Sequence, residues 1–298
     1  MQARANDALI VVGVDGSEGA RHALAWAMQE AACHGAIVEA VHAWQAAAPP
    51  GELAAAAPGW DVEAHRTAAI EELRAAVDAV REAHPQLEAT VTQRVVAGVP
   101  AAAVLDRQDD AALLVVGTRG RGGFSALLLG STSLQVLTHT RRPVAVVPAT
   151  APLNLAGDVV VGVDGSPGSA RALAWAVAEA ARRHATLRVV HGWETPIAVP
   201  PVGVVVTPRS QSAYRSSALA VLERMTAEAQ QEVGVEVAVD LQVADAPAVP
   251  ALLEAGERAA LVVVGTRGRG GFTGLLLGSV SQQVASHAAC ATVAVPPG

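Results

Sequence analysis

The stretch Gly117-Thr-Arg-Gly-Arg-Gly-Gly-Phe124 occurs a second time, unchanged, at residues 265–272. After two further residues, each copy continues into Leu-Leu-Leu-Gly-Ser, which ends at Ser131 in the first copy and at Ser279 in the second. The two copies lie nearly half the chain length apart. A repeat with this period indicates that the protein consists of two copies of one domain.

The repeat extends well beyond the glycine-rich stretch. Residues 10–17 read IVVGVDGS and residues 159–166 read VVVGVDGS, while Val-His-Ala-Trp at 41–44 returns as Val-His-Gly-Trp at 190–193. A chain of 298 residues also has the length of about two ordinary domains. The expected domains are residues 1–149 and residues 156–298.

Short β-branched apolar runs alternate with helical patterns between these motifs. In the first half, strands are predicted at residues 8–14, 37–44, 90–96, 113–116 and 144–147, and helices at residues 18–34, 62–83, 99–109 and 131–138. The helix at 62–83 is predicted to bury Ile70, Leu73, Val77 and Val80 on one face. This alternation indicates an α/β fold: in each domain, a doubly wound, five-stranded parallel sheet with strand order 3-2-1-4-5 and helices on both faces.

In this strand order, strands one and four are neighbours on either side of the point where the order reverses. Doubly wound sheets bind ligands at this point, beside the carboxyl ends of the strands. The first strand leads into Asp15 and the fourth ends at Gly117, and the second domain repeats this with Asp164 and Gly265. Each domain is therefore predicted to hold a site of its own.

The composition narrows the class of protein. Hydrophobic residues make up 51% of the chain, and the net charge of -7 argues against affinity for nucleic acid or anionic membranes. Cys33 and Cys290 hold non-equivalent positions, and no Cys/His metal-ligand cluster exists, which fits a reducing compartment. No signal-peptide core is visible, and no apolar run reaches the roughly 18–20 residues of a membrane span. We expect a cytoplasmic protein with no membrane span and no nucleic-acid partner.

The glycine-rich loop has the chemistry of a phosphate cradle. Its glycines allow positive φ and a close approach of the backbone, and its N–H groups, together with those of the helix that follows, can bind an anion. Arginine side chains supply countercharge, and hydroxyls follow at the helix start. The residues concerned are Gly117, Arg119, Gly120, Arg121, Gly122, Gly123, Gly130, Ser131 and Thr132, and in the second copy Gly265, Arg267, Gly268, Arg269, Gly270, Gly271, Gly278 and Ser279.

Two other interpretations of the loop exist: a plain surface turn, or an RNA-binding Arg-Gly-Gly tract. RNA-binding tracts of this kind are usually disordered repeats. Here each copy lies between a predicted strand and a predicted helix, in the same register. The phosphate cradle is therefore the favoured interpretation.

The spacing of the loop resembles that of a known family. Gly117, Gly120, Gly130 and Ser131 follow the pattern Gly-2x-Gly-9x-Gly-(Ser/Thr), and the second copy keeps the same spacing. Together with the upstream Val-Asp-Gly-Ser, this pattern resembles the ATP-binding branch of the universal stress protein family. The resemblance covers essentially the whole chain, as a tandem pair of such domains.

The resemblance implies a role for each matching position. The phosphates are expected at Gly120, Gly130, Ser131 and Thr132, and at Gly268, Gly278, Ser279 and Val280. The ribose end of the nucleotide is expected at Asp15 and Asp164. The adenine is expected at Gly13, Ala43 and Val116, and at Gly162, Gly192 and Val264. A magnesium ion is expected on the phosphates, and the replacement of Thr132 by Val280 removes one hydroxyl from the second site.

Several residues allow a second interpretation. Asp15 can also shape a turn or cap the next helix, but its recurrence at the predicted switch point favours a role in the site. His42 and His191 are conceivable catalytic bases, but histidines packed on the sheet near the pocket are the favoured interpretation. Trp44 and Trp193 are candidates for a pocket wall. The Pro-containing segments at 45–60 and 194–214 are lids over the ligand or plain linkers.

The function favoured by these observations is that of an ATP-binding stress-response or growth-regulatory protein. It would bind one nucleotide per domain and signal through nucleotide-dependent conformation or partner binding. Catalysis is not evident, since the chain has no Walker loop and no lysine to serve one. The alternatives are a slow Mg-dependent ATPase or nucleotide hydrolase using Asp15 and Asp164, and an interaction module whose sites stay empty.

The last strand of each domain bears on assembly. Residues 144–147 and 292–295 are short apolar strands at a predicted sheet edge, and such edges invite pairing. Family members typically dimerise through this strand. The two halves of one chain can pair with each other in this way, and two chains can then associate further. We expect a homodimer that acts on regulatory protein partners.

Overall fold

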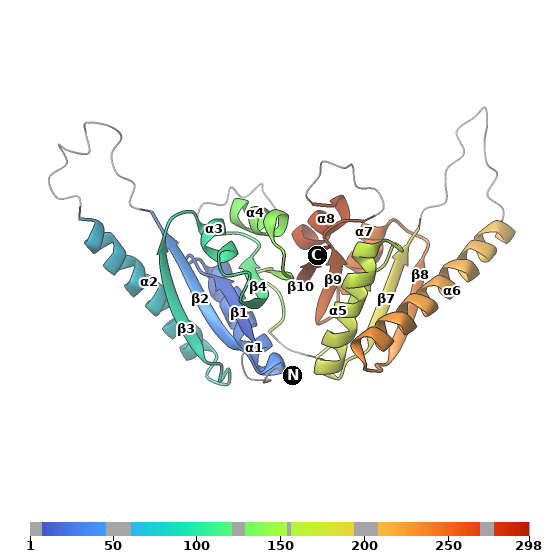
Figure 1. The fold of residues 1–298 in the computed structure, drawn as a ribbon, viewed down its shortest axis with the longest axis horizontal. Coiled ribbons are helices and arrows are strands. Elements are labelled where there is room, and N and C mark those ends of the chain that lie inside the picture. Colours follow the sequence, from blue (N-terminus) through green and yellow to red (C-terminus); the bar gives the residue numbers. More distant parts are fainter. Residues whose placement is uncertain are drawn as a thin grey trace, which may run out of the picture. The chain divides into compact units, whose positions relative to one another are not determined.

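The computed structural model describes residues 8–45, 61–120, 129–153, 156–193, 208–268 and 277–297. The chain divides into two compact units between Ala149 and Thr150. Both units have the α/β architecture that the sequence predicts (Figure 1). No helix of the described ranges is long and apolar enough to cross a membrane.

Unit 1 is a five-stranded sheet with four helices. Its elements are β1 Leu9–Gly13, α1 Glu18–His34, β2 Ile37–Trp44, α2 Val62–Ala83, β3 Val91–Ala97, α3 Pro100–Leu105, β4 Ala111–Gly117, α4 Ser131–His139 and β5 Val144–Val147. The strands pair in the order β3-β2-β1-β4-β5, and every pair is parallel.

Unit 2 repeats this arrangement. Its elements are β6 Val159–Gly162, α5 Pro167–Arg183, β7 Leu187–Gly192, α6 Pro208–Val233, β8 Val239–Ala244, α7 Ala248–Gly256, β9 Leu261–Gly265, α8 Ser279–His287 and β10 Ala291–Val295. The strands pair in the order β8-β7-β6-β9-β10, again all parallel.

The central strands are buried on both faces. Ile10, Val11 and Val12 of β1 are 0% exposed, as are Val159, Val160 and Val161 of β6. Parallel strands covered by helices on both sides have no solvent face, so they read as continuous apolar runs rather than as alternating ones. The sheet is thereby fixed in register, and the strand ends are held as a rigid edge.

The helices divide between the two faces because the direction of winding reverses after β3. The strands β2 and β3 are added on one side of β1, and β4 and β5 are added on the other. In unit 1, α1 packs with α2, and α3 packs with α4. Right-handed crossovers place the first pair on one face of the sheet and the second pair on the other. The two winding directions separate at β1 and β4, where the carboxyl ends of the strands border a crevice.

Three details differ from the sequence-based expectation. The segment at 194–214 was expected to be a lid or a linker, but residues 208–214 already belong to α6, which begins at Pro208. The helix α3 ends at Leu105 rather than at Asp109, because the next bonds run over three residues, from Arg107 N to Val104 O (3.2 Å) and from Gln108 N to Leu105 O (3.0 Å). The chain therefore tightens, and β4 begins two residues earlier than expected. In α2, Ile70 is 42% exposed, whereas the buried face consists of Ala69, Leu73, Ala76, Val77 and Val80.

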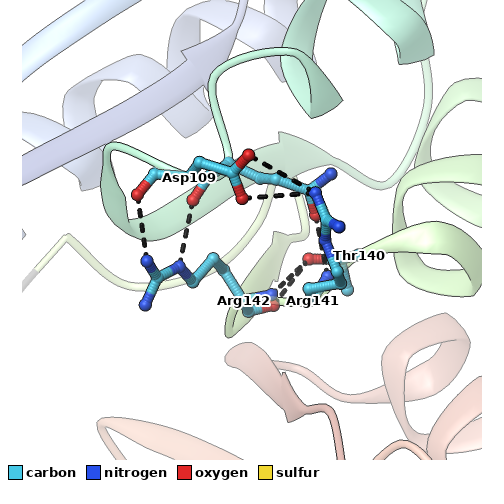
Figure 2. Close-up of polar contacts among 5 residues, drawn as sticks. Asp109, Thr140, Arg141 and Arg142 are labelled. Atoms are coloured by element: carbon cyan, nitrogen blue, oxygen red, sulfur yellow. Dashed lines mark hydrogen bonds and ion pairs between the residues drawn. The ribbon is translucent and has the colours of Figure 1, made fainter. Parts of the chain in front are cut away.

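A polar network ties this tightened turn to the start of β5 (Figure 2). The Arg142 guanidinium donates to the backbone oxygens of Gln108 (3.1 Å) and Asp109 (2.9 Å), and Arg141 reaches the Asp109 carboxylate at 3.2 Å. The Thr140 hydroxyl donates to the Arg142 oxygen at 2.7 Å. These contacts bind two carbonyls of the tightened turn, of which that of Gln108 also accepts the Ala111 N–H of β4 at 3.3 Å. They lie at the amino ends of β4 and β5, opposite to the crevice.

Candidate functional site

A cavity of about 720 Å³ opens at the carboxyl ends of β1, β2 and β4 in unit 1. Its lining includes every predicted site residue of this unit that lies in the described ranges: Gly13, Asp15, Ala43, Val116, Gly117, Arg119, Gly120, Gly130, Ser131 and Thr132. The fold therefore brings together residues that are spread over most of the first half of the chain.

Unit 2 has a smaller cavity at the equivalent place, with a volume of about 410 Å³. Its lining likewise includes the predicted residues of the described ranges: Gly162, Asp164, Gly192, Val264, Gly265, Arg267, Gly268, Gly278, Ser279 and Val280. Trp193, a candidate for a pocket wall, is not among the lining residues. The remaining predicted loop residues lie outside the described ranges: Arg121, Gly122, Gly123, Arg269, Gly270 and Gly271.

The carboxylate after the first strand has a structural role and also faces the glycine loop. Asp15 Oδ1 accepts the Ser17 N–H at 3.0 Å, which shapes the turn before α1. A Cβ atom added to Gly120 would collide with Asp15 Oδ2. Asp164 makes the equivalent bond to the Ser166 N–H at 2.9 Å. The turn-shaping interpretation of Asp15 is thus confirmed, and Gly120 lets the loop backbone lie against the carboxylate.

The two ends of the loop are fixed by short hydrogen bonds. In unit 1, Gly130 N donates to Thr118 O at 2.7 Å, and the Ser133 hydroxyl donates to Gly117 O at 2.6 Å. In unit 2, Gly278 N donates to Thr266 O, also at 2.7 Å. These bonds hold the start of the helix after the loop beside the end of the strand before it.

The helices on either side of the cavity differ in their N-caps. In α1, the Ser17 hydroxyl accepts the Ala20 N–H at 3.1 Å. In α4 and α8, the N-cap residues are Gly130 and Gly278, and neither has a side-chain cap hydrogen bond. The first N–H groups of a helix have no partner within the helix. At α4 and α8 these donors border the cavity without the side-chain acceptor that α1 provides.

The apolar end of each cavity is closed by a helix that the sequence analysis did not assign to the site. A Cβ atom on Gly13 would lie 3.1 Å from Val104 of α3, and one on Gly162 would lie 2.9 Å from Leu252 of α7. At Gly192, a Cβ atom would lie 2.6 Å from the Ala248 Cα atom. The start of α7 therefore approaches β7 more closely than a side chain would allow, which contributes to the smaller cavity of unit 2.

The histidines of β2 and β7 are held by their first ring nitrogen. His42 Nδ1 lies 2.7 Å from Val14 O, and His191 Nδ1 lies 2.7 Å from Val163 O. Since a carbonyl only accepts, each Nδ1 carries the proton. The second ring nitrogen, Nε2, meets residues that no sequence motif had indicated: Glu72 of α2 at 4.0 Å in unit 1, and the hydroxyl of Tyr214 of α6 at 2.9 Å in unit 2.

Two groups with shifted pKa values lie outside both cavity linings. Burial raises the pKa of the Cys290 thiol to about 11. The hydrogen bond to Glu39 is the main cause of the raised pKa of Arg107, whose guanidinium lies 2.7 Å from that carboxylate. Both contribute to the framework of the fold.

Comparisons with known proteins agree with this architecture. The profile of the Universal stress protein family matches residues 9–148 and again residues 157–296. A universal stress protein of Mycolicibacterium smegmatis is 34% identical over 297 residues, which cover 97% of each chain. A universal stress protein from Archaeoglobus fulgidus DSM 4304 covers 99% of this chain and all of its own, with a TM-score of 0.68 and 19% identity. A universal stress protein in complex with cAMP covers 48% of this chain and 97% of its own, with a TM-score of 0.32 and 26% identity. The chain belongs to the universal stress protein family, as a tandem of two of its domains.

Proposed function

We propose that each unit binds one ATP with a magnesium ion and that the protein regulates the stress response or growth through the nucleotide-dependent shape of these sites. The observation that carries this proposal is the helix start beside each cavity. The first turns of α4 and α8 border the cavities, and neither N-cap residue has a side-chain hydrogen bond. Such a helix start binds phosphate through its N–H groups and its dipole.

The residues around each helix start suit a triphosphate. Ser131 and Thr132 line the cavity of unit 1 beside the α4 start, and Arg119 lies on the same cavity. Hydroxyl and N–H donors fix the phosphate oxygens, and a guanidinium supplies charge in a planar geometry that matches them. Unit 2 offers Ser279 and Arg267 in the same roles, with Val280 in place of Thr132.

The other end of each cavity suits a nucleoside. Asp15 lines the cavity of unit 1, and its carboxylate oxygens are acceptors that fit ribose hydroxyls. Beyond Asp15, the cavity is lined by the small and apolar residues Gly13, Ala43 and Val116, which suit an adenine ring. This is the ordinary division of a ligand pocket into an apolar body and a few placed polar groups.

Magnesium would be held mainly by the phosphates. Among the described residues of unit 1, Asp15, Ser131 and Thr132 bring oxygen ligands to the cavity. Magnesium prefers oxygen ligands and usually binds through one or two carboxylates together with substrate phosphates. The bound ion would neutralise phosphate charge that Asp15 would otherwise repel.

Slow hydrolysis by Asp15 and Asp164 is the second candidate, since each carboxylate lies against the glycine loop. In each unit, however, one carboxylate oxygen already accepts a turn N–H, which fits a positioning role better than that of a base. We accordingly propose binding and signalling as the main activity, exercised by a homodimer toward a regulatory protein partner.

The test is to identify and count the bound nucleotide. One sample of purified protein is denatured, and the released ligand is identified by mass spectrometry. A second sample is freed of ligand in the folded state and titrated with MgATP by calorimetry. We expect two ATP per chain, one per chain in Gly120→Val or Gly268→Val, and none in the double variant. The single variants control for each other, and circular dichroism checks that the sheet remains. Failure of the folded wild-type protein to release or bind any adenine nucleotide would overturn the proposal.

A further inference from the structure

We propose that unit 1 selects 6-aminopurine over 6-oxopurine nucleotides through His42 and Glu72, and that unit 2 lacks this selection because Tyr214 occupies the corresponding place. The inference rests on the proposed nucleotide sites and adds the determinants of base selection. It starts from a part of the unit 1 cavity, called the annex here, that is lined by His42, Trp44, His65, Ala68, Ala69 and Glu72. No described side chain of α6 lines the cavity of unit 2.

The two units can be compared position by position along α2 and α6. Leu73 and Leu222 are both buried against their sheets, at 1% and 2% exposure. His65 and Tyr214 each lie eight residues before that leucine. Glu72 and Val221 each lie one residue before it. Unit 2 therefore has a tyrosine where unit 1 has a histidine, and an apolar side chain where unit 1 has a carboxylate.

In unit 2, Tyr214 occupies the place that the annex leaves open in unit 1. Its hydroxyl lies 2.9 Å from His191 Nε2, and its ring lies 4.3 Å from the ring of Trp193, tilted by 30°. Because His191 Nδ1 carries the proton that is donated to Val163 O, Nε2 of the neutral ring is an acceptor and the tyrosine is the donor. The protein itself thus provides the donor that this histidine needs.

In unit 1, the equivalent acceptor faces a second acceptor. His42 Nδ1 donates to Val14 O, so Nε2 of the neutral ring is an acceptor, and it lies 4.0 Å from Glu72 Oε2. His65, at the position of Tyr214, turns to its own helix, with Nδ1 2.8 Å from Asp61 O. The side chains of His42 and Glu72 are 8% and 30% exposed, so both are largely removed from solvent.

Two acceptors at this separation suit an amino group. A nitrogen with two hydrogens can lie about 2.9 Å from both atoms, whereas a carbonyl oxygen at the same place would face two acceptors. The 6-position of adenine carries such an amino group, and hypoxanthine and guanine carry an oxygen there.

The proposed orientation of the nucleotide brings its base to this end. The phosphates are assigned to the α4 start after β4, the ribose to Asp15 after β1, and the base to Ala43 on β2. Ala43 lies between His42 and Trp44, both of which line the annex. The base end is therefore the end nearest to His42 and Glu72.

The experiment compares MgATP with MgITP, which differ at the 6-position of the purine. Calorimetry is done on the full chain with one site removed: Gly268→Val leaves unit 1, and Gly120→Val leaves unit 2. We expect unit 1 to prefer ATP by about ten-fold or more, as a lost hydrogen bond to a charged group implies, and unit 2 to show a preference below about three-fold.

Two matched changes locate the selection in the named residues. Glu72→Gln in unit 1 should reduce the ATP preference to below about three-fold, since the amide can donate to a 6-oxo group. Tyr214→His with Val221→Glu in unit 2 should create the preference, and both positions are about 40% exposed, so the fold tolerates the changes. Equal binding of ATP and ITP by unit 1, or an unchanged ratio in Glu72→Gln, would overturn the inference. Absence of ATP binding in the wild-type chain would instead overturn the proposed function.

Discussion

The two cavities are built on one backbone plan and differ mainly at the end opposite to the glycine-rich loop. At the loop end, Asp15, Gly117 and Gly120 have identical counterparts in unit 2. At the other end, the equivalent pairs are Ala43 and Gly192, His65 and Tyr214, Glu72 and Val221, and Val104 and Leu252. The cavity volumes follow this difference, at about 720 and 410 Å³. Duplication has thus kept one end of the site and varied the other.

The largest effect is expected from exchanging the residues at the ends of β2 and β7. In Gly192→Ala, the new Cβ atom would lie 2.6 Å from Ala248 Cα and 2.8 Å from Ala246 O, which are backbone atoms. We expect the free energy of unfolding to fall by about 3 kcal/mol, because α7 must move away. The reverse change, Ala43→Gly, should cost no more than about 1 kcal/mol. Urea titration measures both, and equal costs would contradict the close approach of α7.

A second difference between the units is the buried thiol before β10. Burial favours the neutral form, so the pKa of Cys290 is raised from 9.0 to about 11. As the pH rises, the thiol ionises in the unfolded chain before it ionises in the folded protein. The contribution of the neutral Cys290 thiol to the free energy of unfolding is therefore complete below pH 9 and is lost as the pH rises toward about 11. The expected loss is about 2–3 kcal/mol. Since the chain has no lysine, few other groups titrate in this window.

Urea titrations at pH 8, 9, 10 and 11 measure this loss. Cys290→Ala should flatten the pH dependence, whereas Cys33→Ala, at a half-buried position in unit 1, should leave it unchanged. A profile that keeps its slope in Cys290→Ala would assign the effect to another group.

The sequence predicted the loop end of the site more completely than the opposite end. The loop end was predictable because Asp15, Gly117 and Gly130 lie in local motifs whose spacing is visible in the chain. At the opposite end, Gly13, Ala43 and Val116 were expected through the family resemblance, and they line the cavity. Glu72, Val104 and Tyr214 were not predicted, because they enter as single residues of helices with no motif around them. One signal was available: Pro100, at the start of the helix that was predicted at residues 99–109, lines the cavity.

The sequence also predicted the fold only in part. Continuous apolar runs that alternate with helical patterns predicted the element types and the α/β class, since strands buried on both faces of a parallel sheet are apolar throughout. The end of α3 was misplaced because the bonds after Leu105 tighten to three-residue spacing, which depends on backbone geometry rather than on residue type. Ile70 was misassigned because both Ala69 and Ile70 fit a helical period, and the smaller residue faces the sheet.

A smaller effect is expected where the two units are identical. In Gly120→Ala, the added Cβ atom collides with Asp15 Oδ2, so the carboxylate must move from its place beside the loop. We expect ATP affinity in unit 1 to fall by about ten-fold, the loss of roughly one hydrogen bond to a charged group. Gly268→Ala should have the same effect in unit 2, where the added Cβ atom would lie 2.5 Å from Asp164 Oδ2. If calorimetry finds the ATP affinity of either site unchanged, the aspartate of that site does not contact the ligand.

The smallest effect concerns the difference between Thr132 and Val280 at the loop end. Thr132 and Val280 are the second residues of α4 and α8, and both line their cavities. If the hydroxyl of Thr132 donates to a phosphate, Val280→Thr should strengthen ATP binding in unit 2 by about three- to ten-fold, and Thr132→Val should weaken it in unit 1 by the same factor. The two side chains have similar shapes, so the exchange tests the hydroxyl rather than packing. Unchanged affinity in both variants would mean that the backbone N–H groups of the helix start bind the phosphate without it. The inequality of the two sites would then arise entirely at the base end.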